Sequence, residues 1–204
     1  MTRKVGIRTY FRDECIVFHK TKESFGGLSN MSAGFPIIIN GIHISTSEAL
    51  YQACRFPLNP SLQDLIISQT SPMTAKMRSK PYKHETREDW LMVRVRIMRW
   101  CLQVKLIQNY SVFSQLLLGT GEKPIVEFSV KDNFWGATPQ GGSILVGANV
   151  LGRLLMDLRL QLQKQLFSLE YLPPPNIKNF LLLNHPIQDT YPRMPDEISP
   201  DLFL

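Results

Sequence analysis

The longest helical pattern in this chain lies between residues 87 and 108. Two apolar stripes run through it in steps of three and four residues, one from Leu91 to Leu106 and the other from Trp90 to Val104. A helix that is apolar on two faces has to be covered on both, because either stripe would otherwise meet water. The pattern therefore predicts a central, mostly buried helix in a globular fold, and 204 residues are enough to build a core around it.

Shorter helical patterns flank the central one, and several carry their own boundary signals. Ser71 before Pro72 is typical of a helix start, because proline fits the first turn. Ser45, followed three residues later by Glu48, predicts a capping box. Gly152 interrupts the last helix and predicts a close approach of another segment. The expected helices cover residues 49–56, 60–69, 72–78, 111–118 and 149–165.

Three strand patterns complete the expected secondary structure. Asn40 and Gly41 separate two runs of β-branched residues, which is typical of a hairpin with a type I′ turn. Residues 15–19 and 125–130 have the composition of two further strands. Together with the helices, these strands predict an α+β fold: a compact, mostly helical single domain with a small β-sheet or hairpin.

The composition changes near the C-terminus. Half of the 14 prolines lie after residue 167, including three in a row at 173–175. Such a density of prolines predicts a partly extended segment. We therefore expect one folded domain over residues 1–167 and a proline-rich tail over residues 168–204, which wraps the domain or binds a partner.

The charge of the chain is uneven. The formal net charge is +6 and the isoelectric point about 9.3, which suits an anionic partner. Nine basic and only three acidic side chains lie between Lys76 and Lys105, a surplus as large as the charge of the whole chain. Such a face can hold phosphates or a nucleic-acid backbone. The alternative is a solvated helix face with no partner.

The cysteines and histidines indicate neither a disulfide framework nor a metal site. Cys15, Cys54 and Cys101 form no C-x-x-C pair, and the four histidines offer no zinc spacing. We expect reduced thiols in a cytoplasmic protein, with no metal or other cofactor. No signal peptide and no apolar run of membrane-spanning length is visible, so we expect no membrane partner. The sequence does not indicate an oligomeric state.

Two loops and one junction contain candidate binding or catalytic groups. Asp132 and Trp135 follow the strand at 125–130, where an acid and an indole suit the rim of a pocket; a surface turn with a half-buried tryptophan is the alternative. Gly26 and Gly27 let backbone amides approach a phosphate or sugar, although for a lone pair of glycines a plain turn is the favoured interpretation. Glu48 lies between a strand and a helix, where it either caps the helix or takes part in catalysis.

Several short stretches, in this order, make the chain similar to the NADAR family, named for NAD and ADP-ribose. The resemblance covers about residues 16–165 and leaves the proline-rich tail outside it. The stretches are 25–30 (FGGLSN), 47–53 (SEALYQA), 71–76 (SPMTAK), Trp90, Lys105 with 108–109 (QN), 119–121 (GTG), 125–127 (IVE), 132–136 (DNFWG) and 147–159 (GANVLGRLLMDLR).

The resemblance implies a compact α+β domain that is a hydrolase, an N-glycosidase breaking the bond between ribose C1 and a nitrogen. Some members of the family cleave early phosphorylated intermediates of riboflavin biosynthesis, and others remove ADP-ribose from guanine in nucleic acid. The substrate is then an ADP-ribosyl or ribosyl-phosphate compound. The basic surplus and the extra tail favour ADP-ribosylated guanine. The alternatives are the riboflavin intermediates, a module that binds ADP-ribose without cleaving it, and a basic nucleic-acid-binding protein with a vestigial pocket.

The functional acids and aromatic residues of the family fall on Glu48, Trp90, Asp132 and Trp135. The chemistry agrees, because cleavage builds positive charge on the ribose, which carboxylates stabilise, while indoles stack on bases. The residues expected to be catalytic are Glu48, Asp132 and Lys105. Those expected to bind substrate are Gly26, Gly27, Asn30, Tyr51, Arg55, Lys76, Trp90, Trp135, Gly136 and Asn149.

The chain departs from the family pattern at Arg55, where many members have a lysine. A lysine amine can form a covalent adduct with the sugar, whereas a guanidinium stays protonated and cannot. Lys76 and Lys105 are the remaining lysines at family positions. The sequence does not establish whether a lysine forms such an intermediate.

Overall fold

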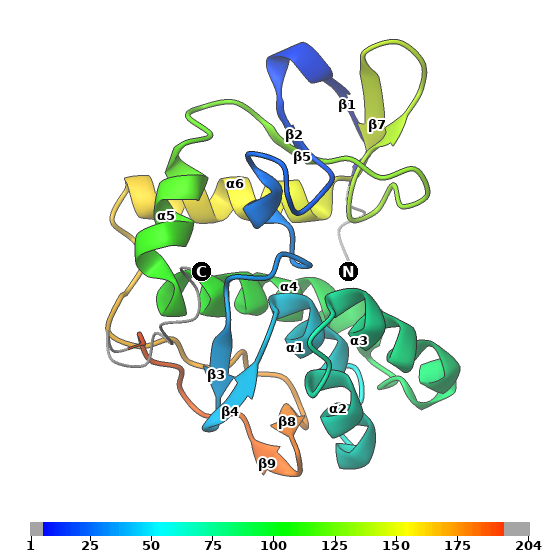
Figure 1. Cartoon of the computed structure of the whole chain (residues 1–204), viewed down its shortest axis with the longest axis vertical. Helices are drawn as coiled ribbons and strands as arrows, with labels where there is room; N and C mark the ends of the chain where they lie inside the picture. The colour runs from blue at the N-terminus through cyan, green and yellow to red at the C-terminus, as the bar shows by residue number, and fades with distance from the viewer. Residues whose placement is uncertain (1–5, 194–204) are drawn as a thin grey trace. The chain divides into compact units, whose positions relative to one another are not determined.

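The computed structural model describes residues 6–193, which fold into helices α1 to α6 and a set of short strands (Figure 1). Helices and small sheets together confirm the predicted α+β class. The chain divides into two compact units. Unit 1 combines Met1–Ser29 with Val112–Phe167, and unit 2 combines Asn30–Ser111 with Ser168–Leu204, each as far as the chain is described.

Unit 1 contains two small sheets and the last long helix. One sheet is antiparallel with the order β1-β7-β6, and in the other β2 pairs in parallel with β5. Helix α6 packs against β5. The strands predicted at 15–19 and 125–130 are present in shorter form, whereas β1 had no clear sequence signal. The elements are β1 (Arg8–Phe11), β2 (Ile16–Phe18), β5 (Ile125–Glu127), β6 (Thr138–Pro139), β7 (Ile144–Gly147), α6 (Val150–Gln163), the 3₁₀ turns Arg12–Glu14 and Gly26–Leu28, and most of α5 (Tyr110–Leu118).

The start of α6 contacts β5 closely at two positions, Asn149 and Gly152. Asn149 has a left-handed backbone, with φ of 47°; its side-chain amide donates to the Ile125 carbonyl at 2.8 Å, and its side-chain oxygen accepts from the Glu127 amide at 3.1 Å. One turn further on, a Cβ at Gly152 would lie 2.1 Å from the Ile125 carbonyl oxygen. The close approach predicted at Gly152 is therefore confirmed, and its partner is the backbone of β5.

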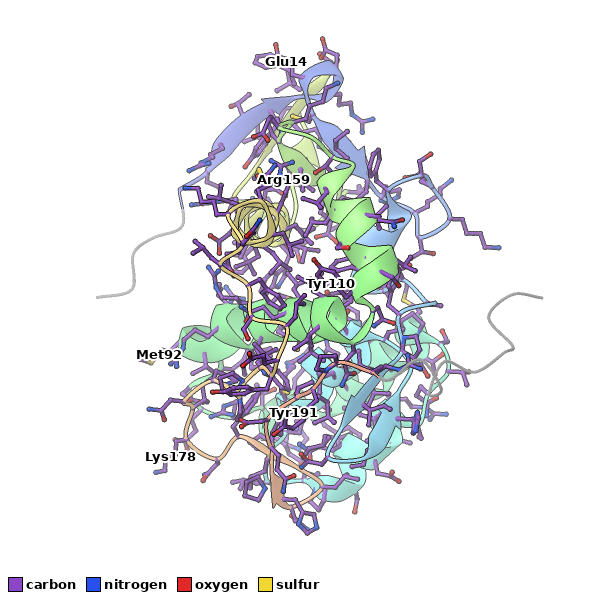
Figure 2. All side chains as sticks on the ribbon, turned by 90° about the vertical axis from the view of Figure 1, so that its left-hand side faces the viewer. Glu14, Met92, Tyr110, Arg159, Lys178 and Tyr191 are labelled. Atoms are coloured by element: carbon purple, nitrogen blue, oxygen red, sulfur yellow. The ribbon has the colours of Figure 1, made fainter. Side chains whose placement is uncertain are left out.

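Unit 2 is organised around α4 (Trp90–Gln108), the predicted central helix. Helix α1 contacts α2, α3 and α4, and α4 also contacts β3. Most of α4 is buried, but its first turn is not, since Leu91 and Met92 are 73% and 71% exposed (Figure 2). The other elements are β3 (Ile37–Ile39), β4 (Ile42–Ile44), α1 (Ser47–Ala53), α2 (Pro60–Ile67), α3 (Pro72–Ser79) and the 3₁₀ helix η3 (Lys80–Glu85).

The predicted hairpin forms between β3 and β4. Asn40 and Gly41 both have positive φ, 52° and 77°, as a type I′ turn requires. The Asn40 side chain also reaches the C-terminal segment, donating to the Pro186 carbonyl and accepting from the Gln188 amide, both at 3.0 Å. The turn residue therefore holds two parts of unit 2 together.

Residues 168–193 of the proline-rich segment pack within unit 2. They include the short strands β8 (Leu181–Leu182) and β9 (His185–Pro186). The rings of Phe180 and Trp100 meet edge to face with centroids 5.1 Å apart, and Gln63 donates to the Leu181 carbonyl at 2.9 Å. The segment thus wraps a folded unit, one of the two roles expected for it. Residues 194–204 lie outside the described residues.

Among residues 6–193, no helix is long and apolar enough to cross a membrane.

Candidate active site

Helix α1 begins with Glu48 held in the interior of unit 2. The helix is capped by Thr46, whose hydroxyl accepts from the Ala49 amide at 3.2 Å. The predicted capping box starting at Ser45 is therefore wrong by one residue. Glu48 occupies the second helical position, where its side chain cannot close such a box and is free to point elsewhere. Its own amide donates to the Asn30 carbonyl at 3.1 Å, and its side chain is buried, with only 6% exposed.

The Glu48 carboxylate is the end of a chain of buried and half-buried polar side chains. Gln52, one turn along α1, donates its amide to a Glu48 carboxylate oxygen at 2.8 Å. The side-chain oxygen of Gln52 accepts from the Arg55 guanidinium at 3.0 Å and from the Ser79 hydroxyl at 3.2 Å. Arg55 in turn donates to the Thr86 hydroxyl at 3.1 Å. We call Glu48, Gln52, Arg55, Ser79 and Thr86 the Glu48 network.

Aromatic rings lie beside the Glu48 network. The Trp90 and Tyr51 ring centroids are 5.1 Å apart and tilted by 45°, and the Arg55 guanidinium carbon lies 5.2 Å from the Trp90 centroid. A delocalised cation over an indole is attracted by the negative face of the ring. The structure therefore brings together Glu48, Tyr51, Arg55 and Trp90, all of which the sequence nominated as site residues.

Burial sets the electrostatics of this group. Desolvation raises the pKa of Glu48, and Lys76, the Gln52 hydrogen bond and Arg55 partly offset that effect, in this order. Burial also raises the pKa of Tyr51 and lowers that of Arg55. A carboxyl group whose pKa is moved upward from its ordinary value can exchange protons closer to neutral pH, as a general acid or base must.

Two buried thiols adjoin the Glu48 network. The Cys101 thiol interacts with the Cys54 thiol, and burial, Cys54 and Glu48 hold the pKa of Cys101 well above its ordinary value. Protonated buried thiols are poor nucleophiles and poor metal ligands. In the described part of the chain, no group of three or more His, Cys, Asp or Glu residues could hold a metal ion.

The two lysines at family positions have different surroundings. Lys105, one turn beyond Cys101 on α4, is fully buried; burial lowers its pKa to about 7, and its ammonium lies 4.3 Å from the Phe35 centroid. Lys76, on α3, is exposed at the surface but close enough to lower the pKa of Glu48. Lys76 is therefore the lysine that acts electrostatically on the buried carboxyl group.

Asn30 has a structural position beside α1. Its side-chain oxygen and its carbonyl both accept from the Ser47 hydroxyl, at 3.2 and 3.3 Å, and its amide contacts the Met98 sulfur. The side chain is 3% exposed. Both ends of the amide are thus used inside the protein, where they fix the start of α1.

The 132–136 loop of unit 1 is held by its own backbone. One Asp132 carboxylate oxygen accepts from the Phe134 and Trp135 amides, both at 2.9 Å. The carbonyls of residues 133–136 accept from the amides of residues 148–151, at distances of 2.7 to 3.1 Å. The exposed Asp132 carboxylate and the half-buried Trp135 ring therefore belong to a loop whose backbone is hydrogen-bonded to the start of α6.

The glycines nominated as binding residues also have packing reasons to be glycine. A Cβ at Gly26 would lie 2.4 Å from the Lys20 and Thr21 carbonyl oxygens, and a Cβ at Gly136 would lie 2.5 Å from the Glu127 carbonyl oxygen. Gly27 follows in the same 3₁₀ turn and is half-buried. Close backbone approach accounts for Gly26 and Gly136 without a ligand, and binding by any of the three stays a prediction.

The structure separates the nominated residues between the two units and adds others. Gly26, Gly27, Asp132, Trp135, Gly136 and Asn149 belong to unit 1, and the rest belong to unit 2. Sequence reasoning missed Gln52, Ser79 and Thr86. The spacing of Gln52, four residues after Glu48 on one helix, was a usable signal. Ser79 and Thr86 had none, because they reach α1 from distant parts of the sequence.

Much of the predicted basic face is used internally. Lys105 is buried, and the guanidinium groups of Arg87 and Arg96 donate to the carbonyls of Lys178 and Asn176. Lys80 and Lys83, which belong to the same basic segment, lie in η3 and are exposed.

The comparisons with known proteins cover both units. The family model of the NADAR domain matches residues 17–163. The N-glycosidase YbiA of Escherichia coli (strain K12) is 34% identical over 160 residues, which cover 78% of this chain and 96% of YbiA. The riboflavin biosynthesis protein VVA0006 of Vibrio vulnificus (strain YJ016) is 34% identical over a stretch that covers 78% of this chain and 41% of that protein. The NMR structure of E. coli YbiA matches with a TM-score of 0.65 and 31% identity, over 78% of this chain and 90% of that chain.

Proposed function

We propose that this chain, which belongs to the NADAR domain family, is an N-glycosidase that hydrolyses a ribose C1–N bond and removes ADP-ribose from guanine in nucleic acid. The N-glycosidase name of YbiA supports the reaction type. The observation that carries the proposal is the Glu48 network, a buried carboxyl group held by side chains from α1, α3 and η3 beside the Trp90 ring. Burying a carboxyl group costs stability, so its retention beside an aromatic ring suits a chemical role.

In the proposed reaction, the C1–N bond breaks and its electron pair leaves with the base, which takes up a proton. Positive charge grows on the ribose ring, and the negative charge of Glu48 stabilises it. A water molecule adds to C1 and gives one proton to Glu48, which acts as the general base and passes this proton on to the leaving nucleobase, so that the carboxylate is restored. The raised pKa of Glu48 helps this step, since a more basic carboxylate accepts a proton more readily.

The neighbouring side chains of unit 2 have binding roles in the proposal. The half-buried Trp90 ring, packed against the buried Tyr51 ring, offers a flat face to a base, and the exposed Lys76 ammonium suits a phosphate of the ADP-ribosyl group. Arg55 stands where many family members have a lysine, and its guanidinium cannot form a Schiff base. We therefore propose direct hydrolysis by water, with Arg55 positioning Gln52 and, through it, Glu48.

A second candidate function is the hydrolysis of phosphorylated riboflavin biosynthesis intermediates. The Vibrio relative and the Zea mays protein PYRR, which is 31% identical over 168 residues, are both named as riboflavin biosynthesis proteins, and this favours it. The exposed Lys80 and Lys83 favour nucleic acid instead, because a small substrate has no need of cations beyond the pocket. The two candidates share the bond that is cleaved and differ in what surrounds it.

The deciding experiment offers both substrates to the protein. An oligonucleotide with ADP-ribosylated guanine and the phosphorylated riboflavin intermediate are incubated separately, and released product is measured by chromatography. The proposal predicts faster release of ADP-ribose, with affinity for the oligonucleotide that falls with salt and a flatter salt slope in Lys80→Glu/Lys83→Glu. Exclusive turnover of the riboflavin intermediate would replace the proposal with the second candidate.

A further inference from the structure

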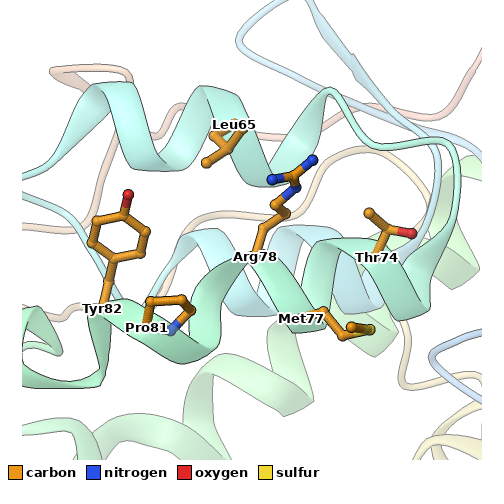
Figure 3. Close-up of a pocket in the computed structure, with 6 residues that line it drawn as sticks. All are labelled: Leu65, Thr74, Met77, Arg78, Pro81 and Tyr82. Carbon is orange, nitrogen blue, oxygen red and sulfur yellow. The ribbon is translucent and has the colours of Figure 1, made fainter.

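Unit 2 contains a pocket that none of the nominated site residues lines. It has a volume of about 400 Å³ and is lined by Leu65 of α2, by Thr74, Met77 and Arg78 of α3, and by Pro81 and Tyr82 of η3 (Figure 3). At 3.6 residues per turn, these α3 residues lie on the face opposite Lys76 and Ser79, the α3 residues that act on the Glu48 network. Helix α3 therefore separates the pocket from Glu48.

The lining of this pocket is apolar with one cation. Leu65, Met77, Pro81 and the Tyr82 ring supply apolar surface, and Met77 is 58% exposed. Figure 3 shows the Arg78 guanidinium and the Tyr82 ring both extending from their backbone toward the helix that carries Leu65. No acidic side chain lines the pocket, and within residues 6–193 no carboxylate pairs with Arg78.

The residues that flank Pro81 and Tyr82 in the sequence are basic as well. Lys80 and Lys83 are exposed on either side of Pro81 and Tyr82. An apolar space lined by a tyrosine ring and an unpaired guanidinium fits a planar ring that carries a negative group. The volume lies within the range of about 300–1,000 Å³ that is usual for small-molecule sites.

We infer that this pocket binds an aromatic base together with its phosphate, and that the base belongs to a nucleotide next to the modified guanine in the substrate strand. The inference rests on the proposed function and adds a second contact to it. Tyr82 stacks on the base, Met77 and Pro81 pack around it, and Arg78 binds the phosphate. Since a helix is about 10 Å across, a strand of a few nucleotides can cross α3 from the pocket to the Glu48 network.

The test measures binding of a fluorescently labelled, unmodified single-stranded oligonucleotide to the full chain. Because Tyr82→Ala loses the stacking on one base, we expect it to bind about tenfold more weakly. Tyr82→Phe keeps the ring and should bind like wild type. Arg78→Gln should weaken binding and flatten the salt dependence. Tyr171→Ala and Lys178→Gln are matched controls, since they remove an exposed ring and an exposed cation from the C-terminal segment of the same unit.

A second arm identifies the source of the base. Binding of free ADP-ribose and AMP is measured by calorimetry in the same variants. The inference predicts unchanged affinity for ADP-ribose in Tyr82→Ala. A loss confined to ADP-ribose and AMP would overturn the assignment to the strand and place the adenylate end of the substrate in the pocket. Equal oligonucleotide affinity in wild type, Tyr82→Ala and Arg78→Gln would overturn the inference altogether.

Turnover separates this inference from the proposed function. ADP-ribosylated guanosine, which has no neighbouring nucleotide, should be cleaved equally well by wild type and Tyr82→Ala, whereas the ADP-ribosylated oligonucleotide should show a higher KM in the variant. If wild type cleaves neither substrate, the proposed function fails, and the binding arms still decide whether the pocket takes a base.

Discussion

The two acids nominated for catalysis, Glu48 and Asp132, are held in opposite ways. Glu48 is buried, and its carboxylate accepts from the Gln52 side chain, which itself accepts from Arg55 in the turn after α1 and from Ser79 of α3. Asp132 is exposed, and its carboxylate accepts from two amides of its own turn. A carboxylate that accepts hydrogen bonds from the amides of a surface turn is common and costs little stability. A buried carboxylate, in contrast, has to be stabilised by distant residues. The difference singles out Glu48 as the acid whose position needs a functional explanation.

The largest effect is expected from Glu48→Gln. Glutamine keeps the size and can still bond Gln52, but it cannot take a proton from water or offset positive charge on the ribose. Removal of a general base typically costs about 10²–10⁴ in rate, so turnover of the cleaved N-glycoside should fall by about that factor. The measurement is single-turnover product release alongside thermal unfolding. Near-normal turnover in a stably folded variant would remove Glu48 from the chemistry.

The next largest effect is expected from Gly152→Ala, which should lower the stability of unit 1. Gly152→Ala places a methyl group against the Ile125 carbonyl and the Asn149 side chain. Neither can move away easily, because the carbonyl is part of the β5 backbone and the Asn149 amide is hydrogen-bonded to it. We expect a loss of several kcal/mol in the free energy of unfolding, on the scale of overpacked cores. Gly142→Ala, in an exposed turn with open space at its Cβ, is a control for the change in backbone entropy, although its φ of 54° adds some strain. Equal unfolding midpoints in denaturant for wild type and Gly152→Ala would contradict the close packing.

A smaller effect is expected at Lys105, where the sign depends on pH. Burial lowers the pKa of this lysine from 10.5 to about 7, so between these values the unfolded chain holds more protons than the folded one. Stability should therefore rise with pH across that window, by at most about 1.4 kcal/mol per pH unit from this group. Lys105→Met should abolish that rise and be more stable than wild type near pH 7. The measurement is the free energy of unfolding of wild type and Lys105→Met from pH 7 to 10. Parallel curves would contradict the prediction, because burial of the ammonium would then not reduce stability.

The smallest effect should come from Asp132→Asn. The asparagine oxygen can accept the same two backbone amides, so the free energy of unfolding should change by less than about 0.5 kcal/mol, whereas Asp132→Ala should lose about 1 kcal/mol. If the carboxylate mainly braces the loop, turnover should fall far less in Asp132→Asn than in Glu48→Gln. A loss as large as that of Glu48→Gln would make the two acids equal partners and end the distinction drawn above.

Local signals in the sequence predicted most of the secondary structure. The Asn40-Gly41 turn, the Ser71-Pro72 helix start and the two-stripe helix predicted at 87–108 each depend on neighbouring residues, and each is present, the helix from Trp90 onward. The cap of α1 was misplaced because Ser45 and Thr46 are both suitable caps, and only the backbone geometry selects Thr46. Proline content suggested a separate tail, whereas Phe180, Leu182 and Ile187 are buried among residues of unit 2.

The candidate site was only partly predictable, for a physical reason. Glu48 and Tyr51 lie three residues apart on α1, and Arg55 follows in the turn just after that helix, so their spacing in the sequence brings them together. Ser79, Thr86 and the Cys54–Cys101 contact depend on how α1 packs against distant helices, which no local pattern encodes. The pocket at Tyr82 was missed because Leu65 faces it from another helix.

The most direct test of the claim that buried Glu48 is the general base is the pH dependence of kcat/KM. For a general base, activity rises with pH through the pKa of the free enzyme's carboxyl group, and burial places that rise above the ordinary range of glutamate. Lys76 lowers the pKa of Glu48, so Lys76→Gln should move the rise to higher pH while Asp132→Asn leaves it in place. A rise that stays fixed in Lys76→Gln and shifts or disappears in Asp132→Asn would contradict the account and assign the proton transfer to Asp132.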